Sequence, residues 1–308
     1  MLLWILLAVV ALILLASGVS LSVYFKKFKV YYERPADERL LEAVMKNKPQ
    51  IVFSTTTIPS RMADLPKLIR NLQKQTILGP HDRIVINLPK ISRRESCPYV
   101  ITDEVRKLSL DDPRVVINSG DDYGPISKIL DTLRVIKDPD ARIFPVDDDC
   151  TFPPEYFEEL LWYSMKDPSK VYGYHGLHVN SEGSYKFAQE FYGEVPVVET
   201  VTGVVYVRKM FTDKIFDVYD HKSPCFFTDD LVLSAHVREN GYQGFLLNSM
   251  KDGGTMRGRK GHAMTNDLDA PNPLYKLNIS GGDAMVDYIS GDTNNAKCLK
   301  MNPILFQQ

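Results

Sequence analysis

A short apolar run that ends in three consecutive aspartates most constrains how this chain can fold. Residues 143–146 read Ile-Phe-Pro-Val and lead directly into Asp147, Asp148 and Asp149. Such a run predicts a buried strand, because parallel strands covered on both faces are almost continuously apolar. The three acids would then lie at the carboxyl end of that strand, which is the edge where open α/β sheets bind ligands.

The acidic triplet, residues 147–149, predicts a divalent metal site. Neighbouring carboxylates repel one another, and burying a carboxylate without a partner is costly. Mg²⁺ and Mn²⁺ take oxygen ligands and also bridge to substrate phosphates, so either cation suits these residues. The alternative is a solvated acidic turn before the pair Pro153-Pro154, because acidic turns are common.

Apolar strand patterns alternate with helical patterns through the first half of the chain. Strands are expected at residues 51–55, 84–88, 114–117 and 143–146, with helices that start near Leu65 and Pro125. The stretch between the second and third of these strands is interpreted as a loop. This order predicts an α/β fold with a mixed, mainly parallel, Rossmann-like sheet flanked by helices.

The second half of the chain carries shorter strand patterns and one clear helix. Strands are expected at residues 171–179, as one or two pieces, at 197–207 with an interruption at Gly203, and at 241–247 after a turn. A helix should begin at Thr228-Asp229-Asp230 and stop at Gly241. Beyond Asn248 the sequence predicts a loop and tail with one short helix at about 283–289.

Composition narrows the class of protein. The 308 residues are 44% hydrophobic and 25% charged, which is ordinary for a globular chain, and the net charge of −2 gives no case for a nucleic-acid-binding surface. The four cysteines contain no CxxC pair, so they form no zinc signature, and any disulfide pairing is left open. They are Cys97, Cys150, Cys225 and Cys298.

The N-terminus predicts a membrane segment. Residues 1–25 carry no charge and exceed the roughly 20 apolar residues that span a bilayer. We favour an uncleaved single-pass anchor over a cleaved signal peptide with Ala16-Ser17-Gly18 as its site, because a basic leading region is missing. The three lysines within residues 26–29 favour a cytosolic catalytic domain by the positive-inside rule. Residues 26–49 then form a stem.

Four segments, taken in order, resemble the nucleotide-sugar glycosyltransferases of the GT-A fold, closest in style to family 2. Residues 54–61 (STTTIPSR) resemble the first-strand loop that holds the nucleobase and ribose, and residues 122–128 (DYGPISK) resemble the loop and helix that complete the nucleotide pocket. Residues 147–149 resemble the DxD motif, and residues 228–230 resemble the "ED" element that carries the catalytic base of inverting enzymes. The resemblance covers residues 50–262 and leaves 263–308 as a C-terminal loop and tail. Two features depart from the family: Asp229 stands where Glu is usual, and the Gln- and Arg-containing acceptor helix of processive members is not evident.

The resemblance implies a role for each matching residue. Asp149 would ligate the metal, Asp147 would contact the ribose or the metal through water, and Asp230, with Asp229 beside it, would be the catalytic base. Simple capping of a helix is the alternative for both of these residues. The residues implied in donor binding are Ser54, Thr55, Thr56, Arg61, Asp122, Lys128, Asp147 and Asp148.

Two basic segments are candidates on their own chemistry. Lys128 lies one turn into its helix, where it could face a diphosphate, and Arg61 is similar; a solvated side chain is the alternative for each. His262 ends the glycine-spaced basic stretch 257–262, which could fold over a diphosphate and bring His262 in as a further metal ligand. A flexible basic loop is the alternative. The sequon Asn278-Ile279-Ser280 is usable only if the domain is lumenal.

These observations predict a metal-dependent glycosyltransferase, a hexosyltransferase or a related enzyme, and the "ED" resemblance implies an inverting one. It would use Mn²⁺ or Mg²⁺, a nucleotide-sugar donor and a glycan, lipid or protein acceptor, at a membrane that is Golgi or ER in a eukaryote. The topology of many anchored sugar transferases, with a lumenal domain, opposes the positive-inside expectation. A nucleotidyltransferase is less favoured, because no GxxxxGK[ST] loop is present. A membrane-anchored binding protein with a degenerate site is the alternative from another class.

Overall fold

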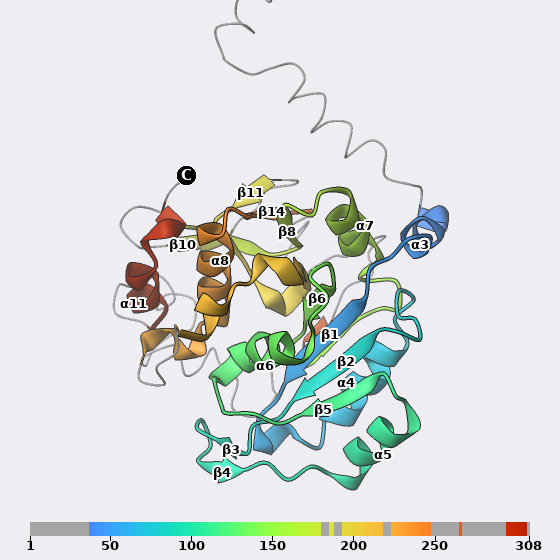
Figure 1. Ribbon diagram of the computed structural model, residues 1–308. Coiled ribbons are helices and arrows are strands. Elements are labelled where there is room, and N and C mark those ends of the chain that lie inside the picture. The colour runs from blue at the N-terminus through green and yellow to red at the C-terminus, as the bar shows by residue number, and fades with distance from the viewer. Residues whose placement is uncertain are drawn as a thin grey trace, which may run out of the picture. The chain divides into compact units, whose positions relative to one another are not determined.

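The computed structural model describes residues 37–179, 185–187, 193–217, 223–247, 265–266 and 294–306. The chain groups into two compact units, residues 1–43 and 44–308, and the second carries the sheet (Figure 1). The predicted anchor at 1–25 and the predicted helix at 283–289 lie outside the described residues. Within the described ranges, no helix is long and apolar enough to cross a membrane.

The described elements follow the alternation expected from the sequence. The helices are α3 (Asp37–Met45), α4 (Leu65–Gln73), α5 (Asp103–Asp111), α6 (Ser127–Val135), α7 (Glu158–Lys166), α8 (Asp229–Glu239) and α11 (Asn294–Met301). The strands are β1 (Ile51–Thr56), β2 (Arg83–Asn87), β3 (Ile91–Ser92), β4 (Cys97–Pro98), β5 (Val115–Asn118), β6 (Arg142–Pro145), β7 (Cys150–Thr151), β8 (Lys170–Gly173), β9 (Gly176–Val179), β10 (Tyr185–Phe187), β11 (Gly193–Val195), β12 (Val197–Val198), β13 (Val204–Val207), β14 (Gln243–Leu246) and β15 (Thr265–Asn266). Short 3₁₀ turns that matter for the site are η1 (Pro59–Arg61), η2 (Gly124–Ile126), η3 (Thr200–Thr202) and η6 (Pro224–Phe227).

Eight of the described strands form one mixed sheet in the order β11-β14-β8-β13-β6-β1-β2-β5. Four of its seven pairings are parallel, so the sheet is mainly parallel, as the sequence predicted. Strand β1 pairs with β2 on one side and with β6 on the other, and Ser54 lies opposite both Val85 and Pro145. The winding direction therefore reverses between β1 and β6. This reversal is the topological switch point, where open α/β sheets bind ligands.

The two faces of β1 are covered by different helices because successive side chains of a strand point to opposite faces. Val52 belongs to the apolar core that includes Ile129 and Leu133 of α6, and α6 packs on β1 and β2 on the near side of the sheet in Figure 1. Phe53 points the other way and lies against Phe157, which immediately precedes α7, with ring centroids 4.9 Å apart. The switch point is therefore packed on both faces of the sheet.

An aromatic cluster holds the chain on either side of the acidic triplet. The ring of Phe144 lies 5.4 Å from Phe53 and 5.4 Å from Phe157, and Phe152 lies 4.8 Å from Phe157. Each such pair contributes about 0.5–1.5 kcal/mol beyond the area it buries. Gly203 fits against the same cluster, since a Cβ there would lie 3.0 Å from the Phe157 ring. The triplet therefore emerges from a rigid part of the core.

Three helices were not predicted from the sequence: α5, α7 (Glu158–Lys166) and α11. Residues 103–111, interpreted as part of a loop, form α5, whose N-cap Thr102 accepts a hydrogen bond from the Val105 amide. Val105 is the buried residue of this helix, so the apolar periodicity that predicts helices is nearly missing. The tail, expected to hold one helix at about 283–289, also contains α11.

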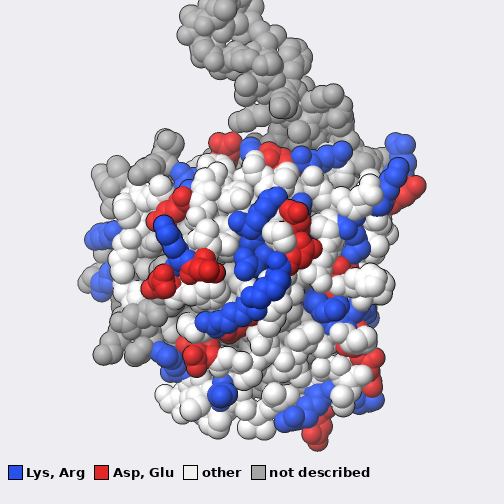
Figure 2. Space-filling model, viewed as in Figure 1, with Lys and Arg blue, Asp and Glu red and all other residues white. Residues whose placement is uncertain are grey.

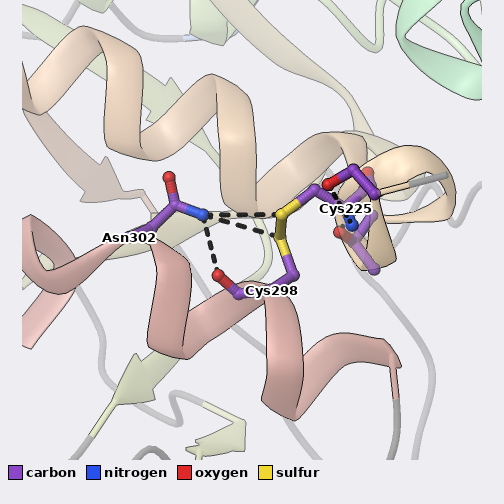
Figure 3. Close-up of a disulfide and its surroundings, with 5 residues drawn as sticks. Cys225, Cys298 and Asn302 are labelled. Atoms are coloured by element: carbon purple, nitrogen blue, oxygen red, sulfur yellow. Dashed lines mark hydrogen bonds between the residues drawn. A yellow bond between two sulfur atoms is a disulfide. The ribbon is translucent and has the colours of Figure 1, made fainter. Parts of the chain in front are cut away.

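A disulfide joins the tail to the start of α8. Cys225 in η6 is bonded to Cys298 in α11, 73 residues away in the sequence. Figure 3 shows the side-chain amide of Asn302 directed at the two sulfur atoms, and it also donates to the Cys298 carbonyl at 2.8 Å. Both cysteines are buried with Leu299 and Leu305 in the main core. The disulfide pairing that the sequence left open is therefore Cys225–Cys298, with Cys97 and Cys150 as free thiols.

Surface charges are mixed. Figure 2 shows a band of Lys and Arg across the middle of the face in view, with Asp and Glu groups beside it. Exposed ion pairs include Lys209–Asp140 at 2.8 Å and Lys107–Asp111 at 2.9 Å. Exposed pairs of this kind contribute about 0–1 kcal/mol each. The charges that matter for function are instead the buried ones at the switch point.

Candidate functional site

The site is built where the loops after β1 and β6 meet the starts of α6 and α8. Gly124 in η2 has φ of +71°, and a Cβ at this position would lie 2.7 Å from the carbonyl oxygen of Phe226 in η6. Only glycine tolerates both the positive φ and this approach. The contact brings the turn before α6 against the turn before α8. It therefore explains how residues a hundred positions apart reach one site.

Lys128, in the first turn of α6, links the two acidic segments. Its ammonium lies 2.6 Å from Asp147 Oδ1 and 2.9 Å from Asp229 Oδ2, and it donates to the Thr200 hydroxyl at 2.8 Å. An ammonium has three N–H donors, and these three acceptors match them. Burial alone would lower the pKa of Lys128, but Asp147, Asp229 and Asp230 raise it well above its ordinary value. Lys128 is thus a buried, permanently charged bridge between the triplet and α8.

Asp230 lies beside this bridge at the N-terminus of α8. Its Oδ1 accepts a hydrogen bond from the Thr200 amide at 2.9 Å. A helix N-terminus stabilises a carboxylate and would make it a poor base. Here burial, followed by the charge of Asp229, raises the pKa of Asp230 well above its ordinary range, although Lys128 opposes the shift. Burial therefore opposes the effect of the helix and makes Asp230 a stronger base than an exposed aspartate.

Asp148 and Arg61 form the second ion pair of the site. The guanidinium of Arg61 lies 2.6 Å from Asp148 Oδ1 and 3.3 Å from Asp149 Oδ2. The Thr57 hydroxyl donates to the other oxygen of Asp148. Burial raises the pKa of Asp148, while Arg61 and Thr57 oppose that rise. Asp148 is therefore tied to the β1 loop.

Asp149 is the least compensated acid of the triplet. Burial, then the charges of Asp147 and Asp148, raise its pKa to about 6 despite the partial contact with Arg61. The thiol of Cys150 donates weakly to its Oδ1 at 3.6 Å. A carboxylate that is costly to ionise beside two other acids is one that a cation would stabilise. The donor set, hard oxygens on adjacent residues, fits Mg²⁺ or Mn²⁺.

The described residues do not by themselves complete a metal cage. Within the described ranges, no group of three or more His, Cys, Asp or Glu side chains is arranged to hold a metal ion. Mg²⁺ at phosphates is typically held by one or two carboxylates, with substrate oxygens and water filling the other positions. Asp149 and Asp147 supply that number. The residues therefore fit a metal that is bound together with a phosphate-containing substrate.

The C-terminal segment returns to the triplet. Strand β15 pairs antiparallel with β7, with Asn266 opposite Cys150 and Thr265 opposite Thr151. His262 lies outside the described residues, but only three positions before Thr265. His262 as a metal ligand stays a prediction.

The donor-binding residues expected on β1 point into the protein. Ser54 is fully buried and donates to the carbonyl of Lys128, and Asn87 donates to Ser54 at 3.1 Å. Thr55 is fully buried as well, and the hydroxyl of Thr56 donates to the carbonyl of Asn87 at 2.8 Å. These side chains hold the strand ends in register beneath the site. Their predicted contacts with a nucleotide stay predictions.

Asp122 lies apart from the triplet, at the loop after β5. Its two carboxylate oxygens accept hydrogen bonds from the amide of Gly124 at 2.7 Å and from the amide of Arg93 at 2.6 Å. It therefore shapes the turn before α6 and holds the β3–β4 hairpin next to it. Of the predicted site residues, the structure brings together Arg61, Lys128, Asp147, Asp148, Asp149, Asp229 and Asp230.

Several residues of the site were not predicted. Thr200 contacts both Lys128 and Asp230, and Glu199 beside it forms an ion pair with buried His175. Burial would lower the pKa of His175, but Glu199 raises it. The interruption of the strand pattern at Gly203 was the one available signal, because it marks the turn η3 that carries Thr200.

A small hollow opens beside the acidic triplet. Its lining includes Arg61, Asp148 and Asp149 together with Asp64 and Lys67 from the start of α4. The triplet is therefore accessible from the side of α4 as well as facing the Lys128 bridge.

Comparisons with known proteins find similarity in solved structures alone. The chain matches no protein-family model and no curated protein. The structure of GalNAc-T7 with UDP, GalNAc and Mn²⁺ is similar over 65% of this chain, with 10% identity and a TM-score of 0.48, and this chain covers 43% of that one. The mannosyltransferase PcManGT from Pyrobaculum calidifontis, in complex with GDP-Man and Mn²⁺, is similar over 96% of this chain and 78% of its own, with 12% identity and a TM-score of 0.49. Both TM-scores lie below 0.5, so the function proposed next rests on the residues of this chain.

Proposed function

We propose that this protein is a GT-A-type glycosyltransferase that moves a sugar from a nucleotide-sugar donor to a hydroxyl group of an acceptor, with inversion and with a divalent metal. The observation that carries the proposal is the Lys128 bridge. It places Asp147 of the acidic triplet and Asp229 of the helix start within 3 Å of one ammonium. A metal-and-diphosphate site and a catalytic base must share one cleft in such an enzyme, and this bridge supports that arrangement.

Each side chain has a task that follows from its contacts. Asp230 accepts the proton of the acceptor hydroxyl, because burial raises its pKa and so strengthens it as a base. Lys128 forms ion pairs with both Asp229 and Asp147, which leaves Asp230 to take that proton. Thr200 fixes the orientation of the Asp230 carboxylate through its amide. Arg61 holds Asp148 and leaves Asp149 partly unpaired.

The metal would be held by Asp149 and Asp147, with His262 as a proposed third ligand. A divalent cation held there would supply positive charge to offset the charge of the leaving diphosphate. The acceptor is a hydroxyl of a glycan, lipid or protein, and the apolar segment 1–25 anchors the enzyme in a membrane as a single-pass protein. These assignments belong to the same proposal.

Calorimetric titration of UDP and GDP, with and without Mn²⁺, tests the donor site. The expected result is binding of one nucleotide that strengthens at least tenfold with Mn²⁺ in the wild-type protein. Asp149→Asn should abolish that metal dependence, while Asp64→Asn, a carboxylate in the same hollow but outside the triplet, should retain it. Release of free sugar from a panel of nucleotide sugars then identifies the donor.

The alternative function is a nucleotide- or sugar-binding protein without turnover. It predicts nucleotide binding that does not depend on metal and no sugar release from any donor. The metal dependence of nucleotide binding and the release of sugar, measured on the same preparation, together decide between the two functions. A protein that binds neither nucleotide contradicts the proposed function and leaves sugar binding alone for the alternative.

A further inference from the structure

Arg94 is a half-buried cation that the mechanism above does not use. It lies in the turn between β3 and β4, and its Nε and Nη2 atoms are enclosed by protein without a hydrogen-bond partner among the described residues. Buried polar groups are almost always paired, and an unpaired one in a native structure calls for a missing partner. A guanidinium is especially costly to bury in this way, because it keeps its charge.

The acids near Arg94 are bonded to other groups. The charges that act on it come from Arg61, Asp148 and Glu95, and its pKa is lowered by burial and then by the like charge of Arg61. Asp148 is already bonded to Arg61 and Thr57, and Glu95 accepts hydrogen bonds from the amide and hydroxyl of Ser60. The carboxylates near Arg94 are therefore committed to other donors. One positive charge at this place is left for a ligand.

The hairpin that carries Arg94 is fastened over the carboxyl ends of the central strands. Tyr99 donates from its hydroxyl to the Thr57 carbonyl at 2.7 Å, and the Arg93 amide donates to Asp122 at 2.6 Å. Contacts to the loop after β1 and the loop after β5 hold the hairpin from both sides. Arg94 is therefore positioned by backbone-level contacts, as a binding group needs to be, at the ligand-binding edge of the sheet.

We propose that Arg94 binds the phosphate oxygens of the nucleoside diphosphate. This inference rests on the proposed function, since it assigns a further residue to the same donor site. The planar fork of a guanidinium matches a phosphate group and forms two parallel charge-assisted hydrogen bonds with it. Together with Arg61 and the metal at Asp149, Arg94 makes the triplet attractive to a dianion despite its three carboxylates. Sequence motifs did not reveal it, because Arg94 lies in none of the four segments that resemble a glycosyltransferase.

The test compares Arg94→Met with Arg93→Met in the full chain. Arg93 is the neighbouring arginine, with an exposed side chain, and serves as the matched control. Inorganic pyrophosphate, UDP and GDP are titrated calorimetrically in the presence of Mn²⁺. Arg94→Met should weaken pyrophosphate and nucleotide binding by about 10- to 100-fold, the size expected for lost hydrogen bonds between charged groups. Arg93→Met should bind as the wild type does, and Arg94→Lys should fall between.

Thermal unfolding without ligand separates a binding role from a structural one. If Arg94 waits for a ligand, removing its uncompensated charge leaves the melting temperature of Arg94→Met unchanged or raises it. The inference would be overturned if Arg94→Met melted at a clearly lower temperature than the wild type while Arg94→Lys bound pyrophosphate as tightly as the wild type. Equal pyrophosphate affinity in wild type and Arg94→Met would also overturn it, even if the preference between UDP and GDP changed. Failure of the wild-type protein to bind any of the three probes would contradict the proposed function itself.

Discussion

At the scale of single residues, the site depends on how five acids share two cations. Lys128 pairs with Asp147 and Asp229, and Arg61 pairs with Asp148. Burial raises the pKa of Asp148, Asp149, Asp229 and Asp230, and the paired cation opposes that rise most directly at Asp148 and Asp229. The unequal pairing separates these two acids from Asp149 and Asp230. This separation is how neighbouring carboxylates take different roles in catalysis.

Asp229→Asn and Asp230→Asn should therefore differ, although the residues are adjacent. Asp230→Asn keeps an acceptor for the Thr200 amide and removes a poorly compensated charge, so we expect unchanged stability, retained nucleotide binding and a loss of transfer of about 10²- to 10⁴-fold. Asp229→Asn removes one partner of a buried ion pair, so we expect a loss of stability of about 3 kcal/mol. Chemical denaturation and transferase assays of both variants check this. Transfer that persists in Asp230→Asn would mean that the base lies elsewhere.

Metal binding should depend on pH through Asp149. Its pKa of about 6 in the folded protein lies above the ordinary value of 3.8. The ionised form is therefore disfavoured by folding: this cost is absent below pH 4, grows between pH 4 and 6, and is complete above pH 6. Mn²⁺ needs the ionised form, so its affinity should rise about tenfold per pH unit below pH 6 and level off above pH 7. Manganese titrations from pH 5 to 8 measure this, and a flat profile would exclude Asp149 as a ligand.

The chemistry of individual residues was largely readable from the sequence, and their partners were not. The acidic triplet and the Asp229-Asp230 pair can be recognised in the sequence as carboxylates at the ends of predicted elements. Arg94, Glu199 and Thr200 carry no such signal, since each acquires its role from contacts made by distant segments. The same limit applies to Ser54, which resembles a donor-binding residue but supports the strand ends from within.

At the scale of elements, the first half of the fold follows from its alternating pattern. The strands β1, β2 and β6 are buried along most of their length, and their apolar runs are visible in the sequence. The antiparallel insertion of β13 between β6 and β8 is not visible, because pairing partners of short strands depend on tertiary contacts. The helix α11 was missed because its attachment is a disulfide and a few buried side chains rather than a long amphipathic face.

Removal of the disulfide should loosen α11 from η6 and disturb the start of α8. A crosslink that closes a loop of 73 residues is expected to stabilise by about 4 kcal/mol in the chain-entropy model. Cys298→Ser should therefore lower the melting temperature by about 10 °C, whereas Cys97→Ser, which changes a free thiol, should leave it within 2 °C or so. Differential scanning fluorimetry measures both. Alkylation of four thiols in the native, unreduced protein would show that the crosslink does not form.

At the scale of the whole molecule, two chemical signals bear on which side of a membrane the unit of residues 44–308 would lie. The lysines after the apolar segment favour a domain on the cytosolic side, where glutathione and thioredoxin keep thiols reduced. The Cys225–Cys298 bond favours the opposite side. The two signals conflict, and they differ in kind: charge bias is a tendency, while the bond requires an oxidant.

We therefore expect the catalytic unit to be translocated. In sealed vesicles from expressing cells, the unit should resist added protease until detergent is supplied, and the acceptor sequon Asn278-Ile279-Ser280 becomes open to glycosylation in a eukaryotic host. Digestion of intact vesicles would contradict this orientation.

The crosslink therefore indicates the compartment that suits this protein, because a disulfide forms and persists where an oxidant is present. In a reducing compartment the loop before Asp229 and Asp230 would be held by packing alone, without the Cys225–Cys298 bond.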